Sequence, residues 1–410
     1  MNPESFTPHY PESDTLSEFE SHPRTFTLED VYNVQQYLAD LKAESIKEGA
    51  DFAPSSEGLY ERLTERVDSG FEQEARAAED SFDKSVHALF SEWATQKGIA
   101  ESAPTSLLDI KKLFVQYPNL NEKSPIHFQG GAEFATSRFV HVKTGRAMGM
   151  AREETTTRYY LNPTADTMGR VVEQLTGAAL EAKVPLYFKF VDVATENPDR
   201  RTLSRNDRVV IYASDAQREF VESTIQDIIR DVPDGLEGRT VAGFAEEIAD
   251  GVARSSEVNE SLNQQSGSRE SFNSLRTKLI YEATIAVTRR VLSSEQNASI
   301  QVGSNTVRGT LAEAVSKELK KLNYPEIKED DPTLLQAVAL GLEPDKLVSA
   351  GFSDKAANAV NKAVRTISKD ILPAIPADIL LKGYERQLDS LAPRYGINPH
   401  NLAENIPIAS

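Results

Sequence analysis

The sequence is 410 residues long, contains no cysteine, and carries 45 Lys and Arg against 63 Asp and Glu, a formal net charge of −18. The lack of cysteine excludes disulfides, thiolate metal ligands and a cysteine nucleophile. The acidic balance disfavours sequence-independent nucleic-acid binding, which depends on a basic surface. No stretch approaches the roughly 20 apolar residues of a membrane helix, and the N-terminus lacks the basic-then-apolar order of a secretory signal. We therefore expect a protein that is made and folded in the cytoplasm, without a nucleic-acid or membrane partner.

The N-terminal part of the chain divides into a tail and a helical region. Residues 1–27 are rich in Ser, Thr, Pro and Glu and cannot bury enough apolar surface to order themselves, which predicts a disordered acidic tail. Type III secretion leaders share this composition, so a delivery signal for a non-Sec route is the alternative. From Leu28 onward, apolar residues recur at three- and four-residue steps, which predicts an N-terminal helical region over residues 28–120.

Residues 121–295 change character and form the predicted core. Short β-branched and aromatic runs bounded by Gly, Pro, Asn or Asp predict strands at 138–143, 157–161, 186–191 and 208–213. Helical patterns follow at 166–183, 215–230 and 268–292. The order strand, strand, helix, strand, strand, helix predicts an α+β fold, with a small, mainly antiparallel sheet and helices on one of its faces.

The last part of the chain is predicted to be a second helical extension, over residues 296–410. Helical patterns punctuated by prolines run from 306 to 395, and we expect the tail after Pro393 to be irregular. The α+β core is thus flanked by N- and C-terminal helical regions.

Several well-known catalytic motifs are absent from the sequence. It has no G-x-x-x-x-G-K-[ST] phosphate loop, no G-x-G-x-x-G after a strand and no G-x-S-x-G elbow. None of the six histidines pairs with another at i,i+3 or i,i+4 spacing, as a metal site on a helix would need. We therefore predict no bound metal and no cofactor.

Cationic side chains gather in and beside the predicted sheet of this otherwise acidic protein. Since residues i and i+2 of a strand share a face, Arg158 and Tyr160 point the same way, as do His141 and Lys143. Lys189 lies between two phenylalanines, where a charge is costly. It either occupies the solvent face of a one-sided sheet or has a lowered pKa and accepts a proton. The alternation of side chains along the strand is compatible with both interpretations of Lys189.

Four segments follow one another in an order that resembles the HopA-type effector family. That family has an R-x-Y-x-N strand, an F-x-K strand, an R-x-D-x-x-V-x-Y strand and a late S-F-x-x-x-R helix. The matching segments are TRYYLNP at 157–163, VPLYFKF at 184–190, LSRNDRVVIY at 203–212 and SFNSLR at 271–276. The helix around Phe90-Ser-Glu-Trp93 is also similar to that family, and the resemblance covers roughly residues 80–295.

The resemblance implies a chemistry. The family includes type III effectors of plant pathogens and tailoring proteins of peptide natural-product (RiPP and lanthipeptide) pathways, in which a separate kinase phosphorylates Ser or Thr. It is also similar to phosphothreonine lyases, which eliminate phosphate without water or metal and leave a dehydroamino acid. By motif, Lys189 would be the base. The proton for the leaving group would come from the phenol of Tyr160 or from His141, because this chain has Arg-x-Tyr where those lyases have Lys-x-His.

The resemblance also implies a phosphate site, made of fixed guanidinium groups. Its predicted members are Arg158, Arg205, Arg276 and, more weakly, Arg208, with Asp207 orienting an arginine. Three of the site residues have plain alternatives: Arg276 as a helix-surface ion pair, Arg205 as a turn residue and Tyr160 as a half-buried core aromatic.

Two functions remain open at this point. The first is a phosphoserine/phosphothreonine lyase acting on a phosphorylated peptide or protein, beside a kinase or after delivery to a host. The second is a non-catalytic effector or adaptor that binds a partner protein or secretion chaperone, since a fold does not establish an activity.

Overall fold

The computed structural model describes residues 23–49, 52–64, 126–129, 139–144, 155–191, 205–236, 243–257, 271–293, 344–349 and 353–406, together with the single residues 19 and 241. Contacts within the chain define two compact units. The sheet unit comprises Thr64–Arg269 with Met1–Arg24 and Ala403–Asn405. The helical unit comprises Thr25–Leu63, Glu270–Leu402 and Ile406–Ser410.

The sheet unit is built on an antiparallel sheet, to which seven strands of the described residues contribute. Across the sheet the order is β1-β2-β4-β5-β3-β7-β6, so β2 and β3, although consecutive in the described chain, are not neighbours. The strands are β1 (Ile126–Gln129), β2 (Phe139–Thr144), β3 (Thr157–Leu161), β4 (Tyr187–Val191), β5 (Val209–Ala213), β6 (Glu246–Ala249) and β7 (Val252–Ser256). The four strands predicted from the sequence are β2, β3, β4 and β5.

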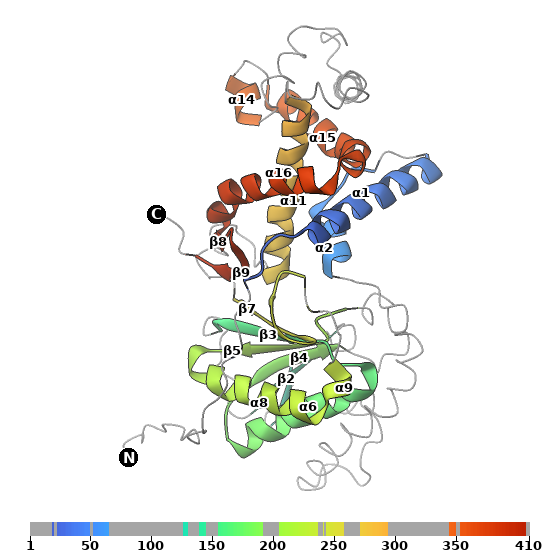
Figure 1. The fold of residues 1–410 in the computed structure, drawn as a ribbon. Coiled ribbons are helices and arrows are strands. Elements are labelled where there is room, and N and C mark those ends of the chain that lie inside the picture. Colours follow the sequence, from blue (N-terminus) through green and yellow to red (C-terminus); the bar gives the residue numbers. More distant parts are fainter. Residues whose placement is uncertain are drawn as a thin grey trace. The chain divides into compact units, whose positions relative to one another are not determined.

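Helices α6 (Ala165–Glu181) and α8 (Arg218–Asp231) lie on the same face of this sheet, with the short α9 (Pro233–Leu236) beside them (Figure 1). Their apolar faces pack against alternate residues of the central strands. The core so formed includes Val140, Tyr159, Phe188, Phe190, Ile211, Met168, Leu175, Val221 and Ile225. The predicted α+β class, with an antiparallel sheet and helices on one face, is therefore confirmed.

Strand alternation leaves a second set of residues on the opposite face of the sheet, which we call the polar face. Its members include Phe139, His141 and Lys143 of β2, Tyr187 and Lys189 of β4, Val210 and Tyr212 of β5, Arg158 and Tyr160 of β3, and Ala253 and Ser255 of β7. Directly paired residues of antiparallel strands share a face, so the strand register fixes this set.

The hairpin of β6 and β7 was missed in the sequence prediction, as was β1. Asp250 and Gly251 form its two-residue turn, and Gly251 has a φ of 66°. This left-handed conformation carries no steric penalty for glycine, and Asp-Gly is a strong hairpin signal. Charged Glu246 and Arg254 obscure the alternating pattern on either side of the turn.

The helical unit combines α1 (Leu28–Glu48) and α2 (Ser56–Thr64) with α11 (Phe272–Ser293), α14 (Pro344–Ser349), α15 (Asp354–Ile371) and α16 (Ala377–Leu391). Thr27 and Asp30 form a capping box at the start of α1, which ends at Gly49 with a φ of 63°. The predicted apolar stripe of α11 is buried and comprises Phe272, Leu275, Leu279, Ile280 and Ala283. The N- and C-terminal helical regions are thus confirmed where they are described.

The prediction of an irregular tail after Pro393 is wrong. Residues 397–398 form β8 (Ile397–Asn398), which pairs with β9 (Asn401–Asn405) in a two-stranded sheet. Gly396, with a φ of 61°, makes the turn into β8. The predicted helix around Trp93 and most of the 1–27 tail lie outside the described residues. Among the residues that are described, no helix is both long enough and apolar enough to cross a membrane.

Candidate active site on the polar face

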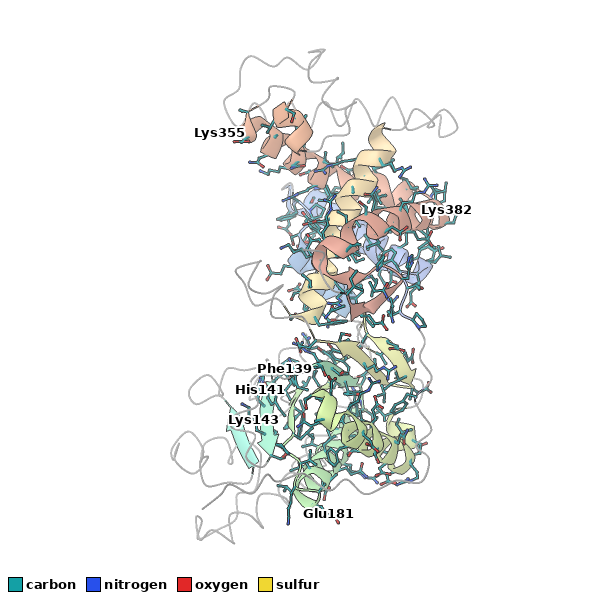
Figure 2. All side chains as sticks on the ribbon, turned by 90° about the vertical axis from the view of Figure 1, so that its left-hand side faces the viewer. Phe139, His141, Lys143, Glu181, Lys355 and Lys382 are labelled. Atoms are coloured by element: carbon teal, nitrogen blue, oxygen red, sulfur yellow. The ribbon has the colours of Figure 1, made fainter. Side chains whose placement is uncertain are left out.

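His141 and Lys189 lie directly opposite each other on the neighbouring strands β2 and β4. Both side chains are half-buried, while Val140, Phe188 and Phe190, their neighbours along the strands, are buried in the core on the other face. Figure 2 marks Phe139, His141 and Lys143, which follow one another along β2. An imidazole and an amine are thereby brought together from positions 48 residues apart (189 − 141).

The ring of Phe139 is shared by two cations. Lys189 Nζ lies 4.1 Å from the ring centroid, and Arg205 Cζ lies 5.2 Å from it. Cations are attracted to the face of an aromatic ring, so the phenyl group gives the amine and the guanidinium a common contact. Arg205 also donates from Nε and Nη2 to the two carboxylate oxygens of Asp207, over 2.7 and 2.8 Å. This bidentate pair fixes the plane of the guanidinium group.

An aromatic row crosses the polar face from β2 to β3. His141 Nδ1 is 2.8 Å from the hydroxyl of Tyr187, whose ring stacks on Tyr212 with centroids 4.6 Å apart. Arg158 Cζ lies 5.0 Å from the centroid of Tyr212, on the next strand. Lys143 Nζ lies 5.2 Å from the centroid of Tyr187. These ring contacts join four adjacent strands of the sheet.

Arg158 is buried and forms a bidentate ion pair with Glu257, just after β7. Burial alone lowers the pKa of Arg158, but Tyr160, Tyr212 and Glu257 together raise it above its usual value. The guanidinium group therefore stays charged, with its charge balanced by the carboxylate.

Tyr160 lies on the same face as Lys189 but two strands away, with Val210 of β5 between them. Strand spacing puts their Cα atoms roughly 10 Å apart. The tyrosine is buried, with 2% of its surface exposed, and its hydroxyl accepts a hydrogen bond from Ser255 Oγ at 3.3 Å. Burial raises the pKa of this phenol well above its usual value, which makes it a weaker acid. It is a buried residue, not the half-buried aromatic of the sequence-based alternative.

The two remaining predicted arginines are fully buried. Arg208 donates from Nη1 to the carbonyl of Pro163 over 2.7 Å and so ties the start of β5 to the chain after β3. Arg276 belongs to the helical unit, where its Nε donates to the carbonyl of Leu402 over 2.9 Å and its Cζ lies 3.9 Å from the centroid of Phe272. The alternative that Arg276 is a helix-surface ion pair is wrong, because its exposure is 0%.

Three aromatic residues of the polar face were not singled out from the sequence: Phe139, Tyr187 and Tyr212. Tyr187 stands two positions before Lys189, so strand alternation alone places it on the lysine's face. Its contact with His141 depends on the pairing of β2 with β4, which alternation does not reveal. Among the described residues, no group of three or more His, Asp or Glu side chains is arranged to hold a metal ion.

Residues 136–325 match the model of the HopA1 effector protein family. This region belongs to that family. The resemblance inferred from the four ordered motifs is thereby confirmed, and the HopA1 region contains every predicted site residue from His141 to Arg276. No curated protein matches the sequence.

Two solved structures of effector proteins are similar to the chain. The effector from Pseudomonas syringae pv. tomato strain DC3000 has 9% identity and a TM-score of 0.32, over 62% of this chain and 88% of that one. The effector from Pseudomonas syringae pv. syringae strain 61 has 10% identity and a TM-score of 0.30, over 56% of this chain and 80% of that one.

Proposed function

We propose that this HopA1-family protein is a phosphoserine/phosphothreonine lyase that eliminates phosphate from a peptide or protein and leaves a dehydroamino acid. The observation that carries the proposal is the direct pairing of Lys189 with His141 on the polar face, with Arg205 on the same phenyl ring as the lysine. Elimination needs a base, an acid and a fixed positive charge, and these three side chains supply one each.

The reaction moves two protons and breaks one C–O bond. Lys189, in its neutral amine form, takes the proton from Cα of the phosphorylated residue. The electron pair of that C–H bond forms the Cα=Cβ double bond, and the bond between Cβ and the bridging oxygen breaks. His141, as the imidazolium, gives a proton to the departing phosphate. The products are a dehydroamino acid and inorganic phosphate, and no water is consumed.

His141 is a better acid for this reaction than Tyr160. The imidazole is half-buried and directly opposite Lys189, whereas the phenol is buried and two strands away. The raised pKa of Tyr160 also makes its proton harder to transfer. We therefore assign the acid role to His141 and expect Tyr160 to hold Arg158 and Ser255 in place.

Arg205 is the arginine we assign to the phosphate. Its guanidinium and the amine of Lys189 both contact the ring of Phe139, and Asp207 fixes its plane. Arg158 faces the same side of the sheet, but it lies on β3, two strands from Lys189, so we expect it to contribute less. Arg208 and Arg276 are buried against backbone carbonyls, which favours a structural role for both.

The test is to incubate the full-length protein with phosphothreonine peptides and to follow the peptide mass. Loss of phosphoric acid is expected for the wild type, with a decrease on the order of 10²- to 10⁴-fold in rate for Lys189→Ala. His141→Ala should also be slow, whereas Tyr160→Phe should keep most of the activity. Lys382→Ala, at an exposed lysine of α16, is the matched control and should behave as the wild type.

Other products would point to other functions. Recovery of the free hydroxyl peptide would indicate a phosphatase. An unchanged peptide across a panel of phosphoserine and phosphothreonine sequences would favour the adaptor function, in which the HopA1 region binds a partner without chemistry.

A further inference from the structure

The hydrogen bond between His141 and Tyr187 is made through Nδ1 of the imidazole. Tyr187 is diagonal to His141 in the strand register, since it pairs with Lys143, and its hydroxyl reaches across to the ring. The two rings are nearly parallel, 21° apart, with centroids separated by 6.0 Å. Through this bond, one nitrogen of the half-buried imidazole is tied to the protein.

Tyr187 itself has little room to move. Its ring is 6% exposed and stacks on Tyr212 at an interplanar angle of 17°, while Lys143 Nζ lies 5.2 Å from its centroid. The guanidinium of Arg158 lies near the ring of Tyr212 and forms an ion pair with Glu257. The tyrosine hydroxyl is therefore a fixed point to which the more accessible imidazole is attached.

We propose that Tyr187 is a positioning residue, which holds His141 through Nδ1 so that Nε2 is the nitrogen that carries and delivers the proton. The lyase part of this proposal rests on the proposed function, whereas the hydrogen bond at Nδ1 does not. A phenol is the stronger acid and an imidazole nitrogen the stronger base, so in the neutral pair the hydroxyl donates to Nδ1 and the ring proton stays on Nε2.

The same hydroxyl also serves the imidazolium form. When Nδ1 gains a proton, the hydroxyl rotates and its oxygen accepts the Nδ1–H bond. Nε2 then gives its proton to the bridging oxygen of the departing phosphate, and the proton on Nδ1 remains with the ring. A histidine whose second nitrogen is held in this way keeps its ring orientation throughout the reaction.

The experiment combines imidazole nitrogen NMR with kinetics on the full-length protein. With ¹⁵N-labelled histidine at about pH 8, where an ordinary imidazole is neutral, His141 should show a proton on Nε2 and an accepted hydrogen bond at Nδ1. Tyr187→Phe keeps the stacked ring and removes only the hydroxyl, so the Nδ1 signal should move to that of a ring without this bond. Its kcat for elimination should fall about ten- to a hundredfold with an unchanged KM, because a positioning residue acts through His141 and not on the substrate.

Tyr159→Phe is the control, since it removes a buried phenol hydroxyl from the helix-covered face of the same sheet. It should leave the Nδ1 signal unchanged. The proposal is overturned if the NMR signal of Nδ1 is the same in Tyr187→Phe and the wild type, or if the neutral His141 ring carries its proton on Nδ1. It is also overturned if Tyr187→Phe has the kcat of the wild type. If the wild type eliminates no phosphate, the proposed function fails, while the Nδ1 signal still decides whether Tyr187 holds His141.

Discussion

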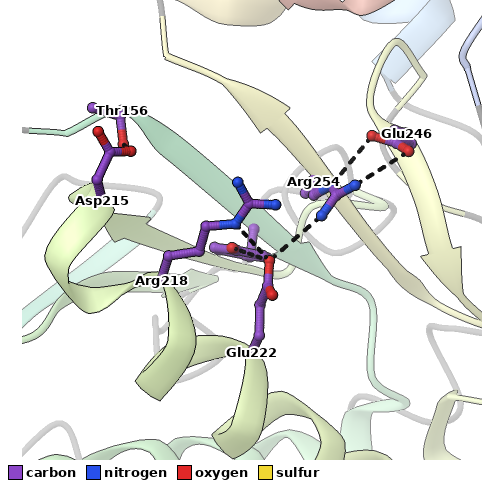
Figure 3. Close-up of polar contacts among 7 residues, drawn as sticks. Thr156, Asp215, Arg218, Glu222, Glu246 and Arg254 are labelled. Carbon is purple, nitrogen blue, oxygen red and sulfur yellow. Dashed lines mark hydrogen bonds and ion pairs between the residues drawn. The ribbon is translucent and has the colours of Figure 1, made fainter. Parts of the chain in front are cut away.

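The hydroxyl of Tyr159 donates to Glu222 Oε1 over 2.7 Å, on the helix-covered face of the sheet. The same carboxylate accepts from Arg218 Nε at 3.1 Å and from Arg254 Nη1 at 3.5 Å, and Arg254 also pairs with Glu246 (Figure 3). Glu222 thus connects α8 to the strands β3 and β7 of the sheet. It is the shared acceptor of this network.

Glu222→Ala is expected to destabilise the sheet unit. The substitution leaves the buried Tyr159 hydroxyl and one side of Arg254 without their acceptor, which costs about 1–3 kcal/mol. Urea unfolding followed by circular dichroism measures the change. Asp227→Ala, on the same helix, breaks an exposed pair with Arg230 and should cost at most about 0.5 kcal/mol. Equal losses in the two variants would mean that the Glu222 network adds nothing beyond a surface ion pair.

Stability should fall at alkaline pH because of buried tyrosines. Burial raises the pKa values of Tyr159, Tyr160 and Tyr384 well above the ordinary value of 10.0. Above about pH 10 the unfolded chain releases these phenolic protons while the folded chain keeps them, so the free energy of unfolding decreases as the pH rises. Each such tyrosine contributes up to about 1.4 kcal/mol per pH unit in that range.

Unfolding curves measured between neutral pH and pH values above about 10 test this expectation. Tyr384→Phe should reduce the steepness of the alkaline decline, because it removes one of the three groups. Tyr32→Phe should not, since Tyr32 is 59% exposed. A free energy of unfolding that stays flat through this range would mean that the buried phenols do not couple folding to pH.

Sequence pattern predicted the central strands from their β-branched and aromatic runs, and in β2 and β4 alternation also predicted the faces of the side chains. In β2, Val140 and Val142 enter the core while His141 and Lys143 face the other way, and in β4 Lys189 lies between two buried phenylalanines. A two-residue period is a local property, so it can be seen without knowing which strands pair. The faces of these site residues were therefore predictable.

Two features depended on contacts that the pattern does not contain. The β6–β7 hairpin places an ion pair of buried Glu246 and half-buried Arg254 on the helix-covered face, so its sequence lacks the apolar alternation by which strands are recognised. The His141–Tyr187 bond requires β2 to pair with β4, although β3 and α6 lie between these strands in the sequence. Such a nonlocal register follows from the packing of the whole sheet, and no single segment encodes it.

Arg205→Lys should weaken phosphopeptide binding by about tenfold, although the charge is kept. The planar guanidinium makes the bidentate pair with Asp207 and lies against Phe139, and an ammonium group reproduces neither geometry. Calorimetry in a Lys189→Ala background, which prevents turnover, measures the dissociation constant. Arg170→Lys, at an exposed arginine of α6, is the control and should bind as the background does. Equal affinities for all three proteins would remove Arg205 from the phosphate site.

Arg276→Ala separates a structural role from a phosphate-binding role for this arginine. The side chain is fully buried in the helical unit, stacks on Phe272 and donates to the Leu402 carbonyl, so its removal loses both packing and a hydrogen bond. We expect a loss of about 2–4 kcal/mol in stability, seen as a lower thermal unfolding midpoint. Arg290→Ala, at an exposed position of the same helix, should unfold as the wild type. A wild-type midpoint for Arg276→Ala together with weaker phosphopeptide binding would instead assign this guanidinium to the ligand.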